Sequence, residues 1–353
     1  MKVLVTRTDR IGDLVLSLPV FDFLARNRPD WELHAMVAPG CEVLVEGAAR
    51  IAGVWTWSDA WAEGRRGDLV ARLRSEGFDA ALMLQYRRQL ALLLKAAGIG
   101  RRFGPRSKPT SWVLLNKGMR QGRAGSGRHE MDLNLELAAR MAGIPWPETP
   151  SGSGSAWRPR LHVGEGHRAF GRDWRAQEAA GFAGVVLVHP GSGGSALDWP
   201  ASSYREVAGG LAKQPGIKVF VTGSAADADR VREVSAGIDA RVGVLLERFT
   251  LGQFLGVLAA ADLLVAPSTG PLHLAAALDT PTIGLFPPAP VMSPARWGQI
   301  GKDAVRMTPA EPCPRKTTCS REKCPLFNCL ETVTATGVVA EAQRLLNGRT
   351  EES

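Results

Sequence analysis

The chain has 353 residues and carries 43 Lys and Arg side chains against 35 Asp and Glu, a formal charge of +8. This length exceeds the size at which one hydrophobic core keeps growing, so we expect two domains, residues 1–160 and 161–353. Apolar runs such as 90–94 are far shorter than the roughly 20 residues that cross a bilayer, and no signal-peptide pattern opens the chain. We therefore expect a cytoplasmic protein whose cysteines stay reduced.

Strand and helix signals alternate along the chain. The first half predicts strands at 2–6, 32–37 and 80–84, and helices at 17–27, 69–76 and 131–142. The second half predicts strands at 185–188, 218–222, 263–266 and 282–286, and helices at 202–214, 225–236 and 271–278. Segment 145–160 is rich in Pro, Gly and Ser, which is typical of a linker. The alternation predicts the α/β class, with two Rossmann-like, doubly wound domains that face a central cleft.

The loop after the first strand carries the first candidate site. In RTDRIGD, the residues Asp9, Arg10, Gly12 and Asp13 fall close together. Gly12 lets a ligand approach the backbone, and a carboxylate at the carboxyl end of a parallel strand faces the ligand edge of the sheet. Asp13 is the better candidate for a general base that accepts a proton from a hydroxyl. The alternative is that Asp13 or Asp9 only caps the following helix.

Two loops of the second half are candidate anion sites. HPGSGGS exposes backbone N–H groups and hydroxyls ahead of a helix, and its candidate residues are Gly191, Ser192, Gly193 and Gly194. In PSTGPLH a strand meets a helix whose first turn contains Pro, so that the free amides and the helix dipole make a seat for a diphosphate. The candidates there are Ser268, Thr269, Gly270 and Pro271, together with His273, which is equally well explained as a buried core histidine.

Two other patterns suggest a metal only weakly. Asp227 and Asp229 are two residues apart on a predicted helix, about 200° around its axis, and would not share an ion, although Asp227 could reach a ribose hydroxyl. Cys313, Cys319, Cys324 and Cys329 have the spacing C-x5-C-x4-C-x4-C, which does not match the C-x2-C knuckles of strong metal sites. We predict no cofactor and no metal, and leave a site at these cysteines as an alternative.

The positive charge is concentrated in the first half. No acidic residue occurs from 80 to 129, whereas eleven Lys and Arg do. Such a stretch attracts polyanions, and the pairs Arg87-Arg88 and Arg101-Arg102 suit bidentate contacts with phosphates or carboxylates. An ordinary basic surface is the alternative interpretation. Nucleic acid is a weaker candidate, because no basic helix with interleaved aromatic residues and no known reader motif is present.

Taken together and in this order, RTDRIGDLVLSLP, HPGSGGSALDWP, STGPLHLAAAL and the cysteine-bearing tail resemble the heptosyltransferases of glycosyltransferase family 9, over nearly the whole length. The resemblance implies a GT-B architecture and an inverting, metal-independent transfer of a heptose or related sugar from a nucleotide-sugar, usually ADP-heptose. The implied acceptor is an anionic glycolipid, the lipopolysaccharide inner core, at the cytoplasmic face of the inner membrane, which implies peripheral membrane contact and no nucleic acid. Asp13 matches the family's catalytic base, the loops around Ser192 and 268–271 match its donor contacts, and Arg10, Gly12 and the two Arg pairs would receive the acceptor.

One position departs from the family's pattern. Leu197 stands two residues before Trp-Pro, where family members often carry a Lys or Arg that would neutralise the leaving diphosphate. Either another cation substitutes, with Arg10 and Arg296 as candidates, or the donor differs, or activity is reduced. The alternatives are therefore a nucleotide-sugar-binding protein that has lost transfer, a transferase that uses another donor or a protein acceptor, and a sugar-nucleotide epimerase on the same scaffold.

Overall fold

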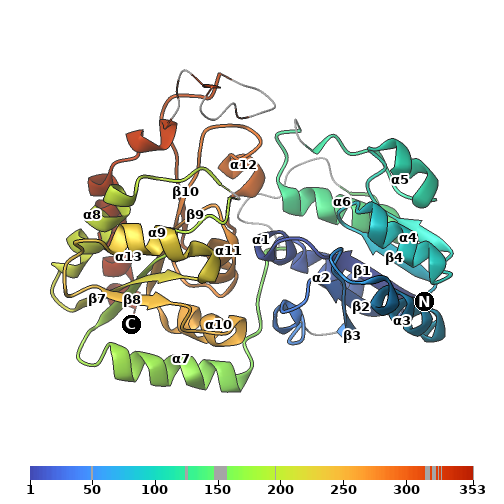
Figure 1. Cartoon of the computed structure of the whole chain (residues 1–353), viewed down its shortest axis with the longest axis horizontal. Helices are drawn as coiled ribbons and strands as arrows, with labels where there is room; N and C mark the ends of the chain where they lie inside the picture. Colours follow the sequence, from blue (N-terminus) through green and yellow to red (C-terminus); the bar gives the residue numbers. More distant parts are fainter. Residues whose placement is uncertain are drawn as a thin grey trace. The chain divides into compact units, whose positions relative to one another are not determined.

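The chain folds into two compact units, Met1–His162 and Val163–Ser353 (Figure 1). The computed structural model describes residues 1–48, 51–123, 126–146, 157–194, 196–314, 319, 323–324, 326 and 328–352. Most of the linker predicted at 145–160 therefore lies outside the described residues. The division between the units falls two residues from the boundary expected at 160/161. None of the described helices is both long and apolar enough to cross a membrane.

The first unit is built on a five-stranded parallel sheet in the order β3-β2-β1-β4-β5. Its strands are β1 (Lys2–Arg7), β2 (Glu32–Val37), β3 (Ile51–Thr56), β4 (Ala80–Met83) and β5 (Arg101–Phe103). Its helices are α1 (Ile11–Val15), α2 (Leu18–Asn27), α3 (Glu63–Glu76), α4 (Arg88–Ala96), α5 (Pro109–Leu114) and α6 (Glu130–Ala142), with a 3-10 turn at Glu42–Leu44.

Side chains of the first sheet alternate between two apolar layers, as the two-residue period of a strand requires. On one face, Leu4 and Met36 join a core made with α3, α4 and Leu114 of α5. On the other face, α2 and α6 pack against each other, and α6 contacts β4. Helices on both faces bury the sheet, which explains why its central strands are continuously apolar.

The second unit is built on a six-stranded parallel sheet in the order β11-β10-β9-β6-β7-β8. Its strands are β6 (Gly184–Val188), β7 (Ile217–Gly223), β8 (Gly243–Leu246), β9 (Leu263–Pro267), β10 (Thr282–Leu285) and β11 (Ala304–Met307). Its helices are α7 (Glu165–Glu178), α8 (Ala201–Ala212), α9 (Ala228–Ser235), α10 (Leu251–Ala260), α11 (Gly270–Ala277), α12 (Pro294–Trp297) and α13 (Ala335–Glu352), with 3-10 turns at Ala225–Asp227 and Cys329–Thr332.

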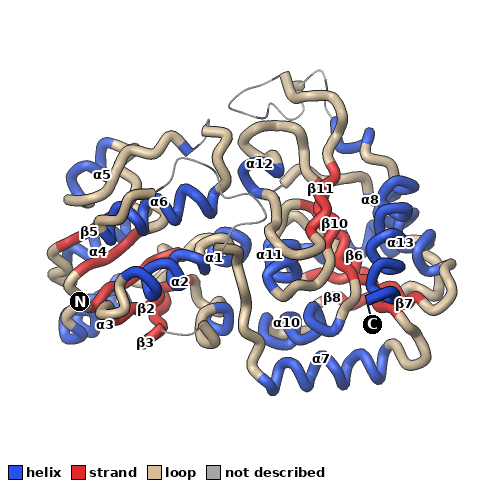
Figure 2. The backbone as a smooth tube through the Cα atoms, turned by 180° about the vertical axis from the view of Figure 1, so that it is seen from behind, coloured by secondary structure: helices blue, strands red, loops and turns tan. Residues whose placement is uncertain are grey.

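Helices cover both faces of this sheet as well. On one face, α8, α9 and α13 pack on Val186, Val188 and Val265 in a core that includes the fully buried Trp199. On the other face, α7 lies beside α10, as both backbone views show (Figure 2). Gly171 and Gly256 allow this close approach, because a Cβ on either would overlap the backbone of the opposite helix.

The predicted α/β class is confirmed, and the predicted strands and helices are present with shifted ends. The helix expected at 17–27 begins at Leu18 and is preceded by the separate helix α1, and the helix expected at 225–236 starts as a 3-10 turn. The elements that were not predicted range from three to 14 residues in length: β3, α4, β5, α5, α7, β8, α10, α12 and β11. Strand β3 escaped prediction because its interior contains Gly53, which weakens a strand pattern but leaves room for the His34 ring of β2.

Candidate functional site

Both sheets reverse their strand order at one point, and most of the candidate residues follow the strands that border this reversal. In the first unit the chain progresses outward from β1 to β3 and then restarts at β4, so the reversal lies between β1 and β4. In the second unit it lies between β6 and β9. Ligands of doubly wound sheets bind beyond the carboxyl ends of the strands at such a reversal. The loops that follow β1, β4, β6 and β9 are therefore the candidate site segments.

Asp13 is held by a buried guanidinium. It lies in α1, directly after β1, and its carboxylate accepts a hydrogen bond from Arg7 at the end of that strand. The side chain of Arg7 is 2% exposed and that of Asp13 is 15% exposed. Arg7 also donates from Nε to Asp9, at 2.7 Å, and ion-pairs with Glu130, at 3.2 Å. One cation thus serves three carboxylates, because the planar guanidinium offers five donors.

Helix α6 completes the support of Asp13. The Asn134 side chain accepts from Arg7 and donates to the Ser17 hydroxyl, at 3.1 Å, which in turn donates to the Asp13 carbonyl. Glu130, one turn earlier in α6, is paired with Arg123 as well as with Arg7. The backbone and the side chain of Asp13 are therefore fixed from both sides.

This environment changes the acidity of Asp13. Burial raises its pKa from 3.8 to about 6, opposed by the positive charge of Arg7 and assisted by the negative charges of Asp9 and Glu130. A carboxylate with a pKa near 6 is mostly ionised at neutral pH, and it is a stronger base than an ordinary aspartate. The α1 N-cap is Arg10, so Asp13 does not cap this helix.

The neighbouring acceptor candidates lie at the same edge of the first sheet. Gly12 is buried within α1, and Arg10 is exposed at its start. Arg87 and Arg88 follow β4, the other strand at the reversal. Arg87 pairs with Asp59 at 2.6 Å while remaining about one third exposed, and Arg88 is exposed at the first position of α4.

The other predicted Arg pair lies elsewhere. Arg101 opens β5 opposite Ala80, which places it at the amino edge of a parallel sheet, away from Asp13. There it contacts the sulfur of Met1. Arg102 is buried, and its guanidinium donates to the carbonyls of Leu114 and Ile99. The assignment of these two residues to an acceptor site is therefore wrong, because one lies at the opposite edge and the other braces the backbone around α5.

The loop after β6 has the conformation expected of an anion cradle. Gly193 and Gly194 have φ values of +51° and +69°, a region that favours glycine, and both are exposed. The hydroxyl of Ser192 accepts from the Gly194 N–H at 3.2 Å. Gly191 is buried beneath them. It has no room for a side chain, because a Cβ there would overlap the Asp227 carboxylate. Exposed N–H groups in such a turn can bind a phosphate.

Asp227 has a structural task in this arrangement. It is buried, and its carboxylate accepts from the backbone N–H and the hydroxyl of Ser224, at 3.1 and 2.6 Å. His189, at the end of β6, lies 3.8 Å from the same carboxylate and 3.0 Å from the Thr222 hydroxyl. Burial lowers the pKa of His189 to about 4, so the ring is neutral at pH 7. Asp227 thus caps a turn and lies against Gly191, and the ribose contact predicted for it stays a prediction.

The junction of β9 and α11 forms as predicted. Thr269 is the N-cap residue, its hydroxyl donates to the Pro267 carbonyl, and Gly270 and Pro271 open the eight-residue helix. Ser268, Gly270 and Pro271 are partly exposed. Because β9 pairs with β6, this helix start lies beside the loop after β6. His273 is buried within α11, which agrees with the alternative that it is a core histidine.

Leu197 and the four tail cysteines border a common cavity of about 530 Å³ in the second unit. Leu197 packs against the core, and each of the four cysteines is partly buried. Burial raises the pKa of the Cys329 thiol, with the other three cysteines contributing in the same direction. Arg296, the candidate substitute cation, lies in α12, which follows β10 at the carboxyl edge of the second sheet.

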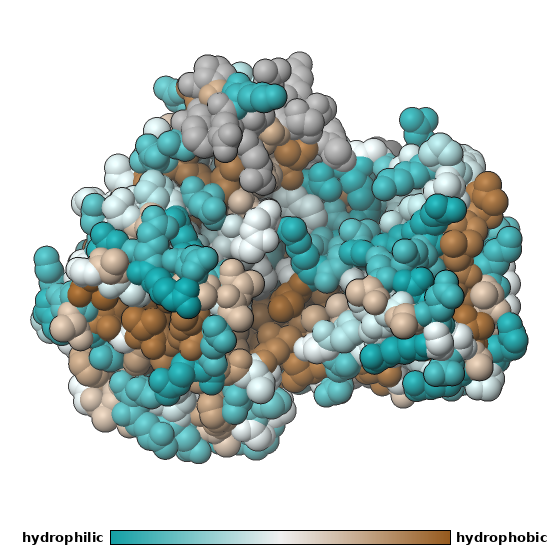
Figure 3. Space-filling model, in the orientation of Figure 1, coloured by the Kyte–Doolittle hydropathy of each residue, from teal (hydrophilic) through white to brown (hydrophobic). Residues whose placement is uncertain are grey.

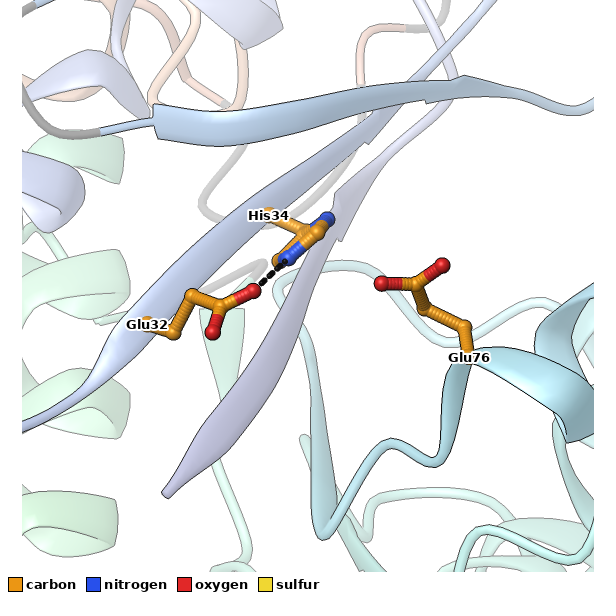
Figure 4. Close-up of side chains that lie close together, drawn as sticks. All are labelled: Glu32, His34 and Glu76. Carbon is orange, nitrogen blue, oxygen red and sulfur yellow. Dashed lines mark hydrogen bonds and ion pairs between the residues drawn. The ribbon is translucent and has the colours of Figure 1, made fainter.

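Among the described residues, one group of possible metal ligands gathers within 4.8 Å, and it contains none of these cysteines. Figure 4 shows its members, Glu32, His34 and Glu76. Lys2 already neutralises both glutamates, at 3.3 and 2.7 Å. The Trp55 indole donates to Nδ1 of His34, which leaves Nε2 to donate to Glu32 at 2.8 Å. With both ring nitrogens engaged and a cation in place, this group is a salt-bridge cluster at the amino edge of the sheet.

Sequence reasoning missed the residues that surround Asp13. Arg7 lies just outside the strand expected at 2–6, Glu130 lies just outside the helix expected at 131–142, and Asn134 was expected only as a member of that helix. A usable signal was present, because a charged residue at the end of an apolar strand needs a buried partner. Glu130 and Asn134 are four residues apart, so they share one helix face and could supply that partner.

Comparison with known proteins gives a consistent result. The model of "Glycosyltransferase family 9 (heptosyltransferase)" matches residues 66–325. A Haemophilus influenzae protein assigned to the glycosyltransferases is 29% identical over 85% of this chain and 86% of its own length. Lipopolysaccharide heptosyltransferase 1 of Pseudomonas aeruginosa is 26% identical over 90% of this chain and 87% of its own length. The structure of Escherichia coli ADP-heptose lps heptosyltransferase II superposes with a TM-score of 0.79 over the full length of both chains, at 24% identity.

Proposed function

Because the chain belongs to glycosyltransferase family 9 and has the GT-B fold, we propose that it transfers a heptose from ADP-heptose to a hydroxyl of the lipopolysaccharide inner core. That it is a glycosyltransferase follows from the family. The donor and the acceptor are our proposal, supported by the Pseudomonas and Escherichia relatives, which are named as heptosyltransferases. The observation that carries the reaction is the ionisable carboxylate of Asp13, fixed by Arg7 at the strand reversal of the first unit.

The second unit would hold the donor. The 191–194 loop follows β6 and the first turn of α11 follows β9, and these two strands are neighbours in the sheet. The backbone N–H groups of the two segments suit the two phosphates of a nucleoside diphosphate. Ser192, Ser268 and Thr269 belong to these two segments. Arg296 would supply positive charge that Leu197 lacks. A cation near the diphosphate matters because charge-assisted hydrogen bonds are among the strong ones.

The chemical step is a single displacement. The Asp13 carboxylate accepts the proton of the acceptor hydroxyl while the oxygen of that hydroxyl attacks the anomeric carbon of the donor sugar. The bond from that carbon to the diphosphate oxygen breaks, and the electron pair leaves with the nucleoside diphosphate. Attack opposite the leaving group inverts the anomeric configuration. Fixed N–H donors that face the departing charge stabilise the transition state, with no reorganisation needed at that moment.

The acceptor would bind to the first unit near Asp13. Arg10, Arg87 and Arg88 offer guanidinium groups to its phosphates or sugar acids, and Gly12 leaves room beside the base. An acceptor of this kind is a lipid, so we also propose that the protein works in the cytoplasm in peripheral contact with the inner membrane.

A panel of sugar nucleotides tests the proposal. The melting temperature of the full chain is measured with each compound, since a ligand that binds only the folded state raises it. Products from a delipidated inner-core acceptor are then identified by mass spectrometry. We expect ADP-heptose to give both stabilisation and an added heptose. Stabilisation by ADP without any product would instead indicate a protein that binds the nucleotide and has lost transfer, and a product with another donor would redirect the donor assignment.

A further inference from the structure

A patch of exposed apolar side chains lies on α4 and α5 of the first unit. Among the described residues, six large apolar side chains are exposed, and three of them are here: Leu92 at 45%, Trp112 at 53% and Val113 at 73%. The two helices pack against each other. In Figure 3 a strip of hydrophobic residues lies over this end of the first unit, among hydrophilic neighbours. Burying such side chains is favourable, so their exposure together marks a contact surface.

Cations surround these side chains. On α4, Arg88, Leu92 and Lys95 are exposed and follow the spacing of one helix face. The segments that flank α5 are joined by a hydrogen bond from the Arg106 N–H to the Met119 carbonyl, with Lys108 just before the helix and Lys117 three residues after it. Arg88, Lys95, Lys117 and Arg120 form no ion pair or hydrogen bond through their side chains with any residue in the described ranges. No acidic residue occurs between 80 and 129.

The shape of Trp112 fits the boundary between water and lipid. The Arg106 guanidinium lies over its ring, 4.0 Å from the centroid, so that an apolar ring and a charged group are presented together. Tryptophan is enriched at membrane interfaces for this combination, and long cationic side chains extend toward headgroups. The Tyr86 hydroxyl bonds Thr110 at 2.8 Å, which ties α5 to the loop after β4, at the sheet edge that carries Asp13.

We propose that α4 and α5 form a docking surface for an anionic lipid bilayer, in which Leu92, Trp112 and Val113 enter the headgroup layer while the surrounding cations face the lipid phosphates. Apolar side chains among uncompensated positive charges are the pattern of interfacial membrane binding. The inference rests on the proposed function only in that a membrane acceptor gives docking a purpose. The docking surface is distinct from the acceptor residues proposed above, apart from the neighbouring Arg88.

Vesicle sedimentation tests this inference with the full chain. The probes are vesicles of phosphatidylcholine alone and vesicles that also contain phosphatidylglycerol. We expect binding to the anionic vesicles only, with a decrease at high salt. The double variant Trp112→Ser, Val113→Ser should bind at least about tenfold more weakly, because two apolar side chains lose their buried site. Lys95→Ala and Lys117→Ala should each weaken binding about fivefold.

The control is Phe182→Ser with Val244→Ser, which removes an aromatic and an aliphatic side chain, exposed by 42% and 41%, from the second unit. It should bind vesicles like the wild type. Equal binding by the control and the docking variant, or no binding by the wild type, would overturn the inference. So would a wild-type dimer that the Trp112 variant converts to a monomer in sedimentation velocity without any vesicle binding, since the surface would then join two copies.

Activity separates this inference from the proposed function. Transfer to a water-soluble, delipidated acceptor should proceed at the wild-type rate in the Trp112 and Val113 variant, whereas transfer to acceptor embedded in vesicles should fall. A matching loss with the soluble acceptor would place α5 in the acceptor site and contradict docking. If the wild type transfers no sugar at all, the proposed function fails while the vesicle result is still decided by the binding data.

Discussion

The guanidinium of Arg7 bonds the carboxylate of Asp13, six positions along the chain, and it does so while buried with Asp9 and Glu130. A single cation therefore sets both the position and the charge of the proposed base. Burial favours protonation of Asp13, and the negative charges of Asp9 and Glu130 add to this effect, so the pKa of Asp13 stays above that of an exposed aspartate although Arg7 opposes the shift.

The rate of transfer should depend on pH through this carboxylate. With a pKa of about 6, Asp13 loses its function as a base once it is protonated, so kcat/KM should fall tenfold per pH unit well below that value. The measurement is the pH dependence of initial rates with ADP-heptose. A decrease in kcat/KM that begins only near pH 3.8, the ordinary pKa of an aspartate, would show that the surrounding residues do not change the pKa of Asp13.

Arg7 variants should separate charge from geometry. Arg7→Lys keeps a cation but lacks the planar guanidinium, so it cannot hold Asp9, Asp13 and Glu130 together. We expect the acidic side of its kcat/KM profile to give a pKa above 6. Arg7→Met leaves buried carboxylates without their partner, which costs about 3–5 kcal/mol in the free energy of unfolding. Arg120→Met, at an exposed cation without a partner among the described residues, is the control and should change stability by less than about 0.5 kcal/mol. Equal losses in Arg7→Met and the control, by urea unfolding, would refute the network.

Stability should respond to the same proton. Because the pKa of Asp13 is raised from 3.8 to about 6, the folded protein holds the proton more tightly than the unfolded chain. The stabilisation is complete below 3.8 and is lost as the pH rises through 6. The difference of about two pKa units corresponds to about 3 kcal/mol. Between pH 3.8 and about 6, we expect the unfolding free energy of the wild type, relative to that of Asp13→Asn, to fall by about 3 kcal/mol. A difference between the two proteins that does not change with pH would contradict the raised pKa of Asp13.

Gly191→Ala should weaken donor binding. The new Cβ would overlap Asp227, which Ser224 holds in place, so the 191–194 loop must move. Overpacking of this kind costs about 1–3 kcal/mol, and when this cost falls on the donor-binding conformation of the loop, the Kd for ADP rises about five- to 140-fold. The control is Gly209→Ala in α8, where a Cβ meets nothing within 4 Å. Calorimetric titration with ADP should show a loss for Gly191→Ala alone, and equal affinities would exclude a role for this loop.

The sequence predicted the sheets and the strand-to-helix loops because period-two apolar runs and glycine-bearing junctions are local patterns. It placed Asp13 and the start of α11 for the same reason. It did not predict that Arg102 is buried, because its guanidinium donates to the backbone carbonyl of Leu114, which lies 12 positions further along the chain. The turn capped by Asp227 is a local feature, since its partner Ser224 is only three positions away, and the sequence reasoning overlooked it. Composition alone made Arg101 and Arg102 look like a ligand pair. Only the strand register shows that Arg101 lies at the wrong edge.

The central claim is that Asp13 is the base of a heptosyl transfer. It is tested most directly by the initial rate of heptose transfer from ADP-heptose to delipidated inner-core acceptor, measured at neutral pH for the wild type and for Asp13→Asn. We predict a rate lower by about 10²–10⁴ in the variant, with ADP affinity unchanged, because the donor loops belong to the other unit. A variant that transfers heptose at the wild-type rate would contradict the account.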